Sequence, residues 1–345
     1  MVKLPTSWKT IHKKLAAAVI LIIILAALPL FIENDYIKHL LIMACVGTIL
    51  GMSFSMLFST GLISLGAGAF YAVGAYISAT LAMNSGISFW LAFPLTIIIA
   101  SILALGVGAI FVRNGGIAFV IITLLFASAV VIAAGQIEFL GGWGGIIGIP
   151  KPTPLGPIQF GSKTPYYYLI LIILLLVVLA YYALYTSYIG RAWKAIKLSP
   201  NLAGTLGINQ YNYRLLAFTI ASTTAAAAGS FYAHYFQTVT PGAFSGWLSI
   251  YIQLYAVLGG LEFYVMGPAV GSIIMTFIPE YLRIIKEYEP IVTGILLLLV
   301  ILFFQGGILG TIINAAKSNN RNNGQAIHSI KSWLQKNKNP GAGER

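Results

Sequence analysis

Few residues of this sequence have types and spacings that could support catalysis. The chain contains no GxxxxGKS/T phosphate-binding loop, no HExxH or CxxC motif and no GxSxG nucleophile motif. Its histidines, His12, His39, His234 and His328, are scattered, and its one cysteine, Cys45, lies in an apolar run. The sequence therefore predicts no catalytic site, no metal site and no cofactor held by this chain itself.

Acidic residues are also too few to drive transport. A proton-coupled carrier usually needs ionisable residues buried within its membrane spans, because they relay the proton. Glu138 and Glu262 are the two acids that approach the hydrocarbon outside obvious acidic loops, and both are predicted at span ends. Any energy for transport is therefore expected to come from another protein.

Basic residues instead gather in one internal stretch, residues 187–218, which reads SYIGRAWKAIKLSPNLAGTLGINQYNYRLLAF. They are Arg191, Lys194, Lys197 and Arg214, in a chain that is only 8% charged. Pro200, Gly204 and Gly207 separate two stretches of helical pattern, which predicts a short helix, a turn and a return into the membrane. Such a segment either contacts a separate ATPase or rests on lipid headgroups.

The composition indicates that membrane-spanning helices flank this basic stretch. Hydrophobic residues make up 59% of the 345 residues, and the mean hydropathy is +0.89, whereas about a quarter of the residues of a soluble domain are charged. Repeated apolar runs near ~20 residues predict an all-α polytopic membrane protein, and residues 166–185 lack the alternation of a β-barrel strand. The net charge of +12 fits basic loops beside anionic lipid and does not indicate nucleic acid binding.

About ten transmembrane helices are predicted in one permease domain, residues 15–312. The spans are placed at 15–32, 38–58, 61–83, 88–111, 117–135, 165–186, 214–236, 249–263, 265–285 and 290–312. The third is so rich in Gly, Ala and Ser that a broken or re-entrant helix is expected, and the eighth is short. A basic segment, 1–14, precedes the domain. A basic tail, 313–345, is expected to be flexible, with either a surface helix or disorder at 326–336.

The distribution of positive charge orients these spans. Placing the N-terminus in the cytoplasm puts 15 of the 20 Lys and Arg residues inside. The five outside are Lys38, Lys151, Lys163, Arg283 and Lys286. The positive-inside rule favours this orientation over its reverse. Both termini are then cytoplasmic, the first span is a signal anchor, and 187–213 is the longest internal cytoplasmic segment.

Two spans carry small residues at close spacing. The candidates in the third span for the lining of a translocation path are Ser64, Gly66, Gly68, Ala72 and Gly74. Such residues allow close backbone approach, and unwound backbone there could meet the carboxylate and ammonium groups of a zwitterion; the alternative is a helix-packing seam. In the seventh span the small residues recur every four positions, at Ala221, Ala225, Gly229 and Ala233, which favours helix packing.

The basic stretch resembles the cytoplasmic loop of LivM-like permeases of branched-chain amino acid ABC importers, which typically reads GRAxxAIRENExAAxxxGINxxxxKxxAF. The matching residues are Gly190, Arg191, Ala192, Ala195, Ile196, Lys197, Ala203, Gly207, Ile208, Asn209, Ala217 and Phe218. The segments GLISLGAGAFYAVGAYISATL, GGIAFVIITLLFA, LGGWGGIIGIP and LYAVLGGLEFYVMGPAVGS also resemble family motifs, so the likeness covers roughly residues 45–312. Two departures stand out. The acidic and alanine positions of the loop are here 198–202, LSPNL, and the histidine of the family's SLGHAAF is replaced by Gly68 or Ala67, depending on the alignment.

This resemblance implies a permease subunit of an ATP-binding-cassette importer in the cell membrane. The implied partners are a second homologous permease, two ABC ATPases that hold ATP and Mg²⁺, and an extracytoplasmic solute-binding protein. The residues implied for the ATPase-coupling loop are Gly190, Arg191, Lys194, Ala195, Lys197, Ala203, Gly204 and Gly207. The departures leave urea or short amides open as solutes, and an ATP-independent carrier or channel is the alternative class. An integral-membrane enzyme is disfavoured, because no catalytic set of residues can be assembled.

Overall fold

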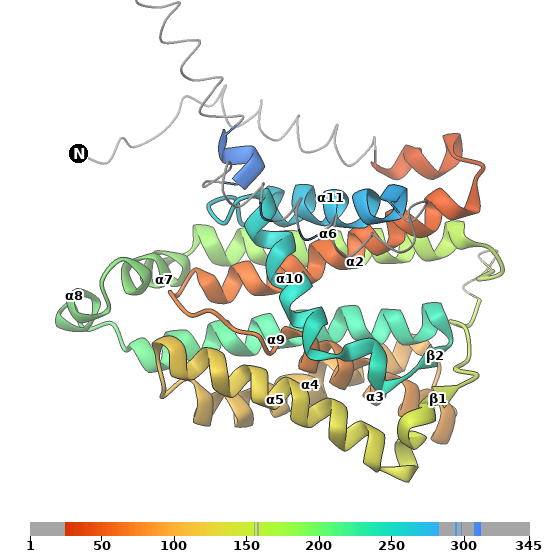
Figure 1. The fold of residues 1–345 in the computed structure, drawn as a ribbon, viewed down its shortest axis with the longest axis horizontal. Helices are drawn as coiled ribbons and strands as arrows, with labels where there is room; N and C mark the ends of the chain where they lie inside the picture. Colours follow the sequence, from red (N-terminus) through yellow and green to blue (C-terminus); the bar gives the residue numbers. More distant parts are fainter. Residues whose placement is uncertain are drawn as a thin grey trace, which may run out of the picture.

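The structure, a computed structural model, describes residues 25–154, 156, 159–282, 294, 298 and 307–311. The helices are α2 (Asp35–Phe58), α3 (Ala67–Asn84), α4 (Phe89–Phe111), α5 (Gly116–Gln136), α6 (Lys163–Thr186), α7 (Tyr188–Leu198), α8 (Pro200–Thr205), α9 (Gln210–Phe236), α10 (Gly246–Gly259) and α11 (Met266–Leu282). Most of the long helices lie side by side in one bundle (Figure 1). The short helices α7 and α8 project at one end of the bundle, at the left of Figure 1.

In the described part of the chain, five helices, α2, α4, α5, α6 and α9, are long and apolar enough to cross a membrane. They have 21 to 27 residues, and a spanning helix needs about 20. The most apolar windows of α2 and α9 are 89% and 72% buried, against 22% in the other three. The bundle is therefore built around α2 and α9, and α4, α5 and α6 present apolar side chains outward.

Several predicted spans match these helices. Those at 38–58, 88–111, 117–135, 165–186 and 214–236 are confirmed as helices within a few residues of their bounds. The span predicted at 265–285 corresponds to α11. Of the first span, residues 25–31 are described and are helical. Most of the span at 290–312, the segment 1–14 and the tail 313–345 lie outside the described residues.

The third predicted span is helical only in its second part. A helix was expected from residue 61, broken or re-entrant, but residues 61–66 form no α-helix and α3 begins at Ala67. The N–H of Leu65 donates to Thr123 Oγ1 over 3.1 Å, and the N–H of Gly66 donates to Ser64 Oγ over 3.0 Å. Side-chain acceptors of this kind compete with helical hydrogen bonds. Because Thr123 belongs to α5 and lies away from its ends, α3 starts inside the bundle.

A second short helix, α10, has a similar arrangement. It follows a 3₁₀ turn, Pro241–Phe244, and has 14 residues, so it is too short to span a membrane alone. It occupies 246–259, whereas 249–263 was predicted. The N–H of Gly68 in α3 donates to Ser249 Oγ in α10 over 3.2 Å. The first turns of the two short helices therefore meet within the bundle.

The prediction of an all-α fold misses a small antiparallel sheet at the end of the bundle opposite α7 (Figure 1). Its strands are β1 (Ile146–Ile147) and β2 (Thr238–Val239), which join the α5–α6 connection to the end of α9. His234 strengthens this junction, because its imidazole lies 2.8 Å from the Pro150 carbonyl oxygen and 3.0 Å from Ser78 Oγ. The contacts of this buried histidine are hydrogen bonds between elements.

Glycines bring α3 and α9 into backbone contact. A Cβ atom on Gly74 would lie 2.5 Å from the Cα of Ala226, and one on Gly229 would lie 2.9 Å from the nitrogen of Ala75. These separations are shorter than real Cβ contacts allow, so neither position accepts a side chain without moving a helix. The four-residue repeat of small residues in α9 is buried along its length: Ala221, Ala225, Gly229 and Ala233. Gly229 thus lies in a packing seam, as its spacing predicted.

Candidate functional site

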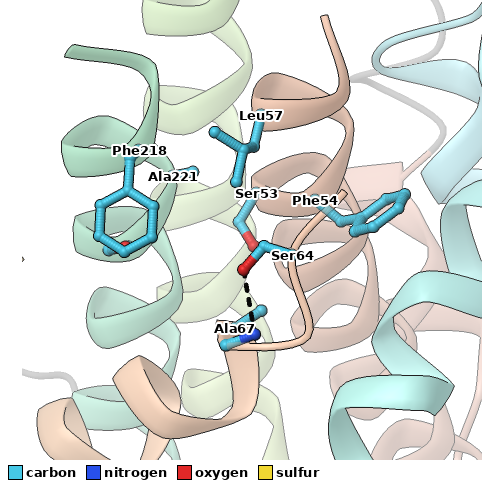
Figure 2. A pocket seen from close by; sticks show the side chains of 9 residues that line it. Ser53, Phe54, Leu57, Ser64, Ala67, Phe218 and Ala221 are labelled. Atoms are coloured by element: carbon cyan, nitrogen blue, oxygen red, sulfur yellow. Dashed lines mark hydrogen bonds between the residues drawn. The ribbon is translucent and has the colours of Figure 1, made fainter. Parts of the chain in front are cut away.

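A small cavity lies at the N-terminus of α3, between α2 and α9 (Figure 2). Its volume is about 20 Å³, which is room for about one water molecule. The lining residues are Ser53, Phe54, Leu57, Ser64, Gly66, Ala67, Phe218, Ala221 and Ser222. The lining therefore combines hydroxyl groups with aromatic and aliphatic walls, and it contains no charged side chain.

The start of α3 supplies backbone groups to this cavity. The N–H groups of Leu65, Gly66 and Gly68 are taken by the hydroxyls of Thr123, Ser64 and Ser249. Ala67 also lines the cavity, and its N–H makes no hydrogen bond with any residue that the structure describes. A helix leaves its first N–H groups without intrahelical acceptors and carries partial positive charge at that end. This end of the cavity therefore favours a hydrogen-bond acceptor.

The five path candidates of the third span fall in different surroundings. Ser64 and Gly66 line the cavity. Gly68 contacts α10, where a Cβ would lie 2.6 Å from Ser249 Oγ. Ala72 is buried in the core, and Gly74 faces the α9 backbone in the packing seam. The structure thus brings two of the five together at the cavity and places Gly74 in helix packing.

Sequence reasoning missed the other residues of the cavity. Ser53, Phe54 and Leu57 come from α2, and Phe218 and Ser222 come from α9. Ala221 was singled out from its spacing, but for packing. Ser53 and Ser222 are hydroxyl residues within apolar helices, but other hydroxyl residues stand close to each of them, Ser55 near Ser53 and Thr223 beside Ser222, so this signal is weak.

The predicted coupling loop folds into two helices with well-defined caps. Ser187 caps α7 by accepting the N–H of Ile189, and Ser199 caps α8, which begins with Pro200 at its first position. Trp193 anchors α7, because its side chain is fully buried and its Nε1–H donates to the Tyr213 carbonyl over 2.9 Å. The loop is therefore held against the start of α9.

Two of its basic side chains turn back onto the bundle. Lys197 Nζ lies 3.9 Å from the centre of the Phe58 ring, at the end of α2, and Lys194 Nζ lies 5.9 Å from the centre of the Tyr264 ring. Burial lowers the pKa of Lys197, while the Glu262 carboxylate acts in the opposite direction. Arg191 is exposed. Lys197 therefore ties α7 to the point where the chain leaves α2 for α3.

The small residues of the loop have separate roles. A Cβ on Gly190 would lie 2.5 Å from the Tyr185 carbonyl oxygen, so this glycine permits α7 to approach α6 closely. Ala203 is buried and Ala195 is partly buried. Gly204 is an interior residue of α8 with room for a side chain. The left-handed conformation falls on Gly207, whose φ is +79°.

Three exposed leucines lie at the end of α7, in α8 and directly after α8. Leu198 is 86% exposed, Leu202 is 66% exposed and Leu206 is 77% exposed. Leu198 ends α7, Leu202 lies in α8 and Leu206 directly follows α8, and the extended Ser199, with φ −157°, separates Leu198 from the other two. Leu198 and Leu202 stand in the segment 198–202, where the resemblance would place acidic and alanine residues. These three residues, called the leucine ridge below, are an apolar surface at the end of the bundle.

Replacing Lys197 with methionine is expected to destabilise the protein by about 1 kcal/mol, because the charge over the Phe58 ring is lost while the apolar stem is kept. The measurement is the thermal unfolding temperature of the detergent-solubilised protein. Lys194→Met is the matched control, and its effect should be smaller because Nζ is farther from its ring, at 5.9 Å. Equal unfolding temperatures for both variants and the wild type would contradict the assigned role of Lys197.

No cluster of three or more His, Cys, Asp or Glu side chains in the described part of the chain could hold a metal ion. Its helices instead bring hydroxyl groups and one free helical N–H to an interior cavity, and an apolar ridge to one end. Such an arrangement can bind a small polar group inside the bundle and a protein partner outside it.

The comparisons with known proteins agree on one family. A family model described as "Branched-chain amino acid transport system / permease component" matches residues 36–304. The permease protein LivM of the high-affinity branched-chain amino acid transport system of Salmonella typhimurium is 28% identical over 315 residues, 84% of this chain and 73% of that protein. LivM of Escherichia coli K12 is 28% identical over 326 residues, 87% of this chain and 76% of that protein.

A shorter match is found to LivH, the permease protein of the same named system in Escherichia coli K12, with 29% identity over 126 residues, 36% of this chain and 40% of that protein. No solved structure matches the chain. Together with the five described helices that are long and apolar enough to cross a membrane, these findings make the chain a multi-pass protein of the cell membrane with a role in transport. The chain belongs to the family of permease components of branched-chain amino acid transport systems.

Proposed function

We propose that this chain is a transmembrane permease subunit of an ATP-binding-cassette importer for branched-chain or related amino acids. ATP and Mg²⁺ are bound by two separate ATPase subunits, and an extracytoplasmic binding protein delivers the solute. A second, homologous permease completes the path. The relatives LivM and LivH, both permease proteins of one named transport system in Escherichia coli K12, support that pairing.

The observation that carries the proposal is the leucine ridge on α7 and α8. An exposed apolar surface on a short, well-anchored helical loop is suited to a protein partner, since interface cores are apolar and depleted of charge. Trp193 and Lys197 fix the loop to α9 and to the end of α2. A partner that moves the ridge would therefore move the start of the segment that leads to α3.

The orientation in this proposal places the α7 end of the bundle in the cytoplasm, with about ten spans and both termini cytoplasmic. The described basic residues support it. Tyr211 OH donates to the Ala109 carbonyl over 3.0 Å, which brings the end of α4, followed by Arg113, to the start of α9. Arg113 thus shares this end with Arg191, Lys194 and Lys197, as the positive-inside rule requires of a cytoplasmic face.

Leu202→Glu is expected to abolish co-purification of the ATPase and leucine uptake, because a carboxylate in the centre of an apolar contact must be desolvated without a partner. The measurement is the ATPase-to-permease ratio in affinity-purified complexes from native membranes, together with uptake of radiolabelled leucine. Leu202→Met is the control, since it keeps an apolar side chain of similar volume.

Two results would overturn the proposal. Retention of the ATPase and of uptake by Leu202→Glu would remove the ridge from the ATPase contact. Leucine or urea flux in liposomes that contain this chain alone would identify a carrier or channel that needs no ATPase. Import of urea or acetamide, without leucine, by the complete complex would reassign the solute to short amides.

A further inference from the structure

We propose that the cavity at the N-terminus of α3 is the subsite that receives a carboxylate oxygen of the transported amino acid. This inference deepens the proposed function and rests on it. The subsite consists of two hydrogen-bond donors, the Ala67 N–H and the Ser222 hydroxyl, and an apolar wall of Phe54, Leu57 and Phe218.

Ser222 lines the cavity, and its hydroxyl has no hydrogen-bond partner among the described residues. Its side chain is 5% exposed. The neighbouring threonines of α9 behave differently, because Thr219, Thr223 and Thr224 each donate to the carbonyl four residues earlier. Most polar side chains inside a protein have a hydrogen-bond partner, so an unpaired hydroxyl that borders a cavity is available to a ligand. An acceptor atom in the cavity would pair with Ser222 and with the Ala67 N–H.

The electrostatic surroundings favour a negative acceptor. The first turns of α3 and α10 meet at the hydrogen bond between Gly68 and Ser249. Each helix carries partial positive charge at that end, so their approach raises the potential in the bundle interior. Paired helix N-termini at such a depth bind anionic substrate groups. None of the described residues that line the cavity carries a carboxylate to neutralise the charge.

The composition of the lining also restricts the solute. None of the nine lining residues is charged, so an ammonium group would find no counter-charge there. The volume of about 20 Å³ admits a single small group. The carboxylate therefore enters first, and the ammonium group and side chain remain in the path outside the cavity. A neutral amide would gain less from the two helix ends than a carboxylate, which favours amino acids over urea.

Cysteine labelling tests the position and sign of the subsite. In the complete importer in liposomes, Ser222→Cys should react faster with anionic 2-sulfonatoethyl methanethiosulfonate than with the cationic trimethylammonium analogue, after correction for their rates with free thiol. Leucine should slow the reaction, and leucinol, which lacks the carboxylate, should not. Ser230→Cys is the control on the same helix, because Ser230 is fully buried and donates to Ser78 over 2.7 Å. The wild type, with buried Cys45, gives the background.

Ser222→Ala supplies the second measurement. Loss of a hydrogen bond to a charged group should reduce leucine uptake by about tenfold or more, with normal complex assembly and ATP hydrolysis, whereas Ser230→Ala should not reproduce this pattern. A cavity that holds only water would show equal rates for the two reagents, no protection by leucine and normal uptake by Ser222→Ala. That outcome overturns the subsite while the wild type still imports leucine. A wild-type complex that imports no branched-chain amino acid would overturn the proposed function itself.

Discussion

Gly74→Leu is expected to prevent the accumulation of folded protein. The new side chain would enter the α3–α9 seam, where even a Cβ atom would lie 2.5 Å from the Cα of Ala226. The obstacle is backbone, so no rotamer change can relieve it, and the helices must separate. Overpacking of a core typically costs about 1 to 3 kcal/mol, and a clash with a helix backbone should exceed that range. The measurement is the yield of monodisperse protein after detergent extraction, and its unfolding temperature.

Two further glycines make this prediction specific. Gly229→Leu should fail similarly, because a Cβ there would lie 2.9 Å from the Ala75 nitrogen. Gly106→Leu in α4 should be tolerated, because no atom lies within 4 Å of its Cβ position, and leucine favours a helix over glycine by about 0.5 to 1 kcal/mol. Normal yield and unfolding temperature for Gly74→Leu would mean that α3 and α9 do not cross at these glycines.

The long helices could be predicted because one physical requirement defines them. A membrane span needs about 20 apolar residues, and its backbone hydrogen bonds must form within the helix itself. The apolar runs of α4, α5 and α6 meet both requirements without partners from elsewhere in the chain. The start of α3 depends instead on partners distant in sequence. Thr123 takes the Leu65 N–H from another helix, and nothing within residues 61–66 shows that this acceptor will be present.

The cavity was only partly predictable for the same reason. Ser64 and Gly66 stand out in a stretch of small residues, so their own segment identifies them. Ser222 becomes distinctive only when its hydroxyl is seen to lack the carbonyl partner that Thr223 and Thr224 have. The leucine ridge was likewise hidden, because in the sequence its members were departures from the resemblance, and their exposure is a property of the folded loop.

Gly207→Val is expected to uncouple the importer. At the C-terminal end of α8 the N–H of Ile208 donates to the Ala203 carbonyl over 3.1 Å, and the N–H of Gly207 donates to the Gly204 carbonyl over 3.0 Å. This pair of hydrogen bonds is a Schellman cap, which places its left-handed residue at Gly207, with φ +79°. A left-handed L-residue costs about 1 to 2 kcal/mol, and β-branching adds to the strain. Valine should therefore open the cap and displace α8 with its exposed leucines.

The substitution should impair the coupling between ATP hydrolysis and solute import, while the membrane helices stay folded. No atom lies within 4 Å of the Cβ position of Gly207, so valine meets backbone strain but no steric clash. The expected result is normal extraction and an unchanged unfolding temperature of the bundle, with an ATPase that dissociates or no longer responds to solute and binding protein. Gly207→Asn is the matched control, because asparagine tolerates the left-handed conformation and should keep most of the uptake. If Gly207→Val bound its ATPase and imported leucine at the wild-type rate, α7 and α8 would be a lipid-facing connection and not the point at which the ATPase acts.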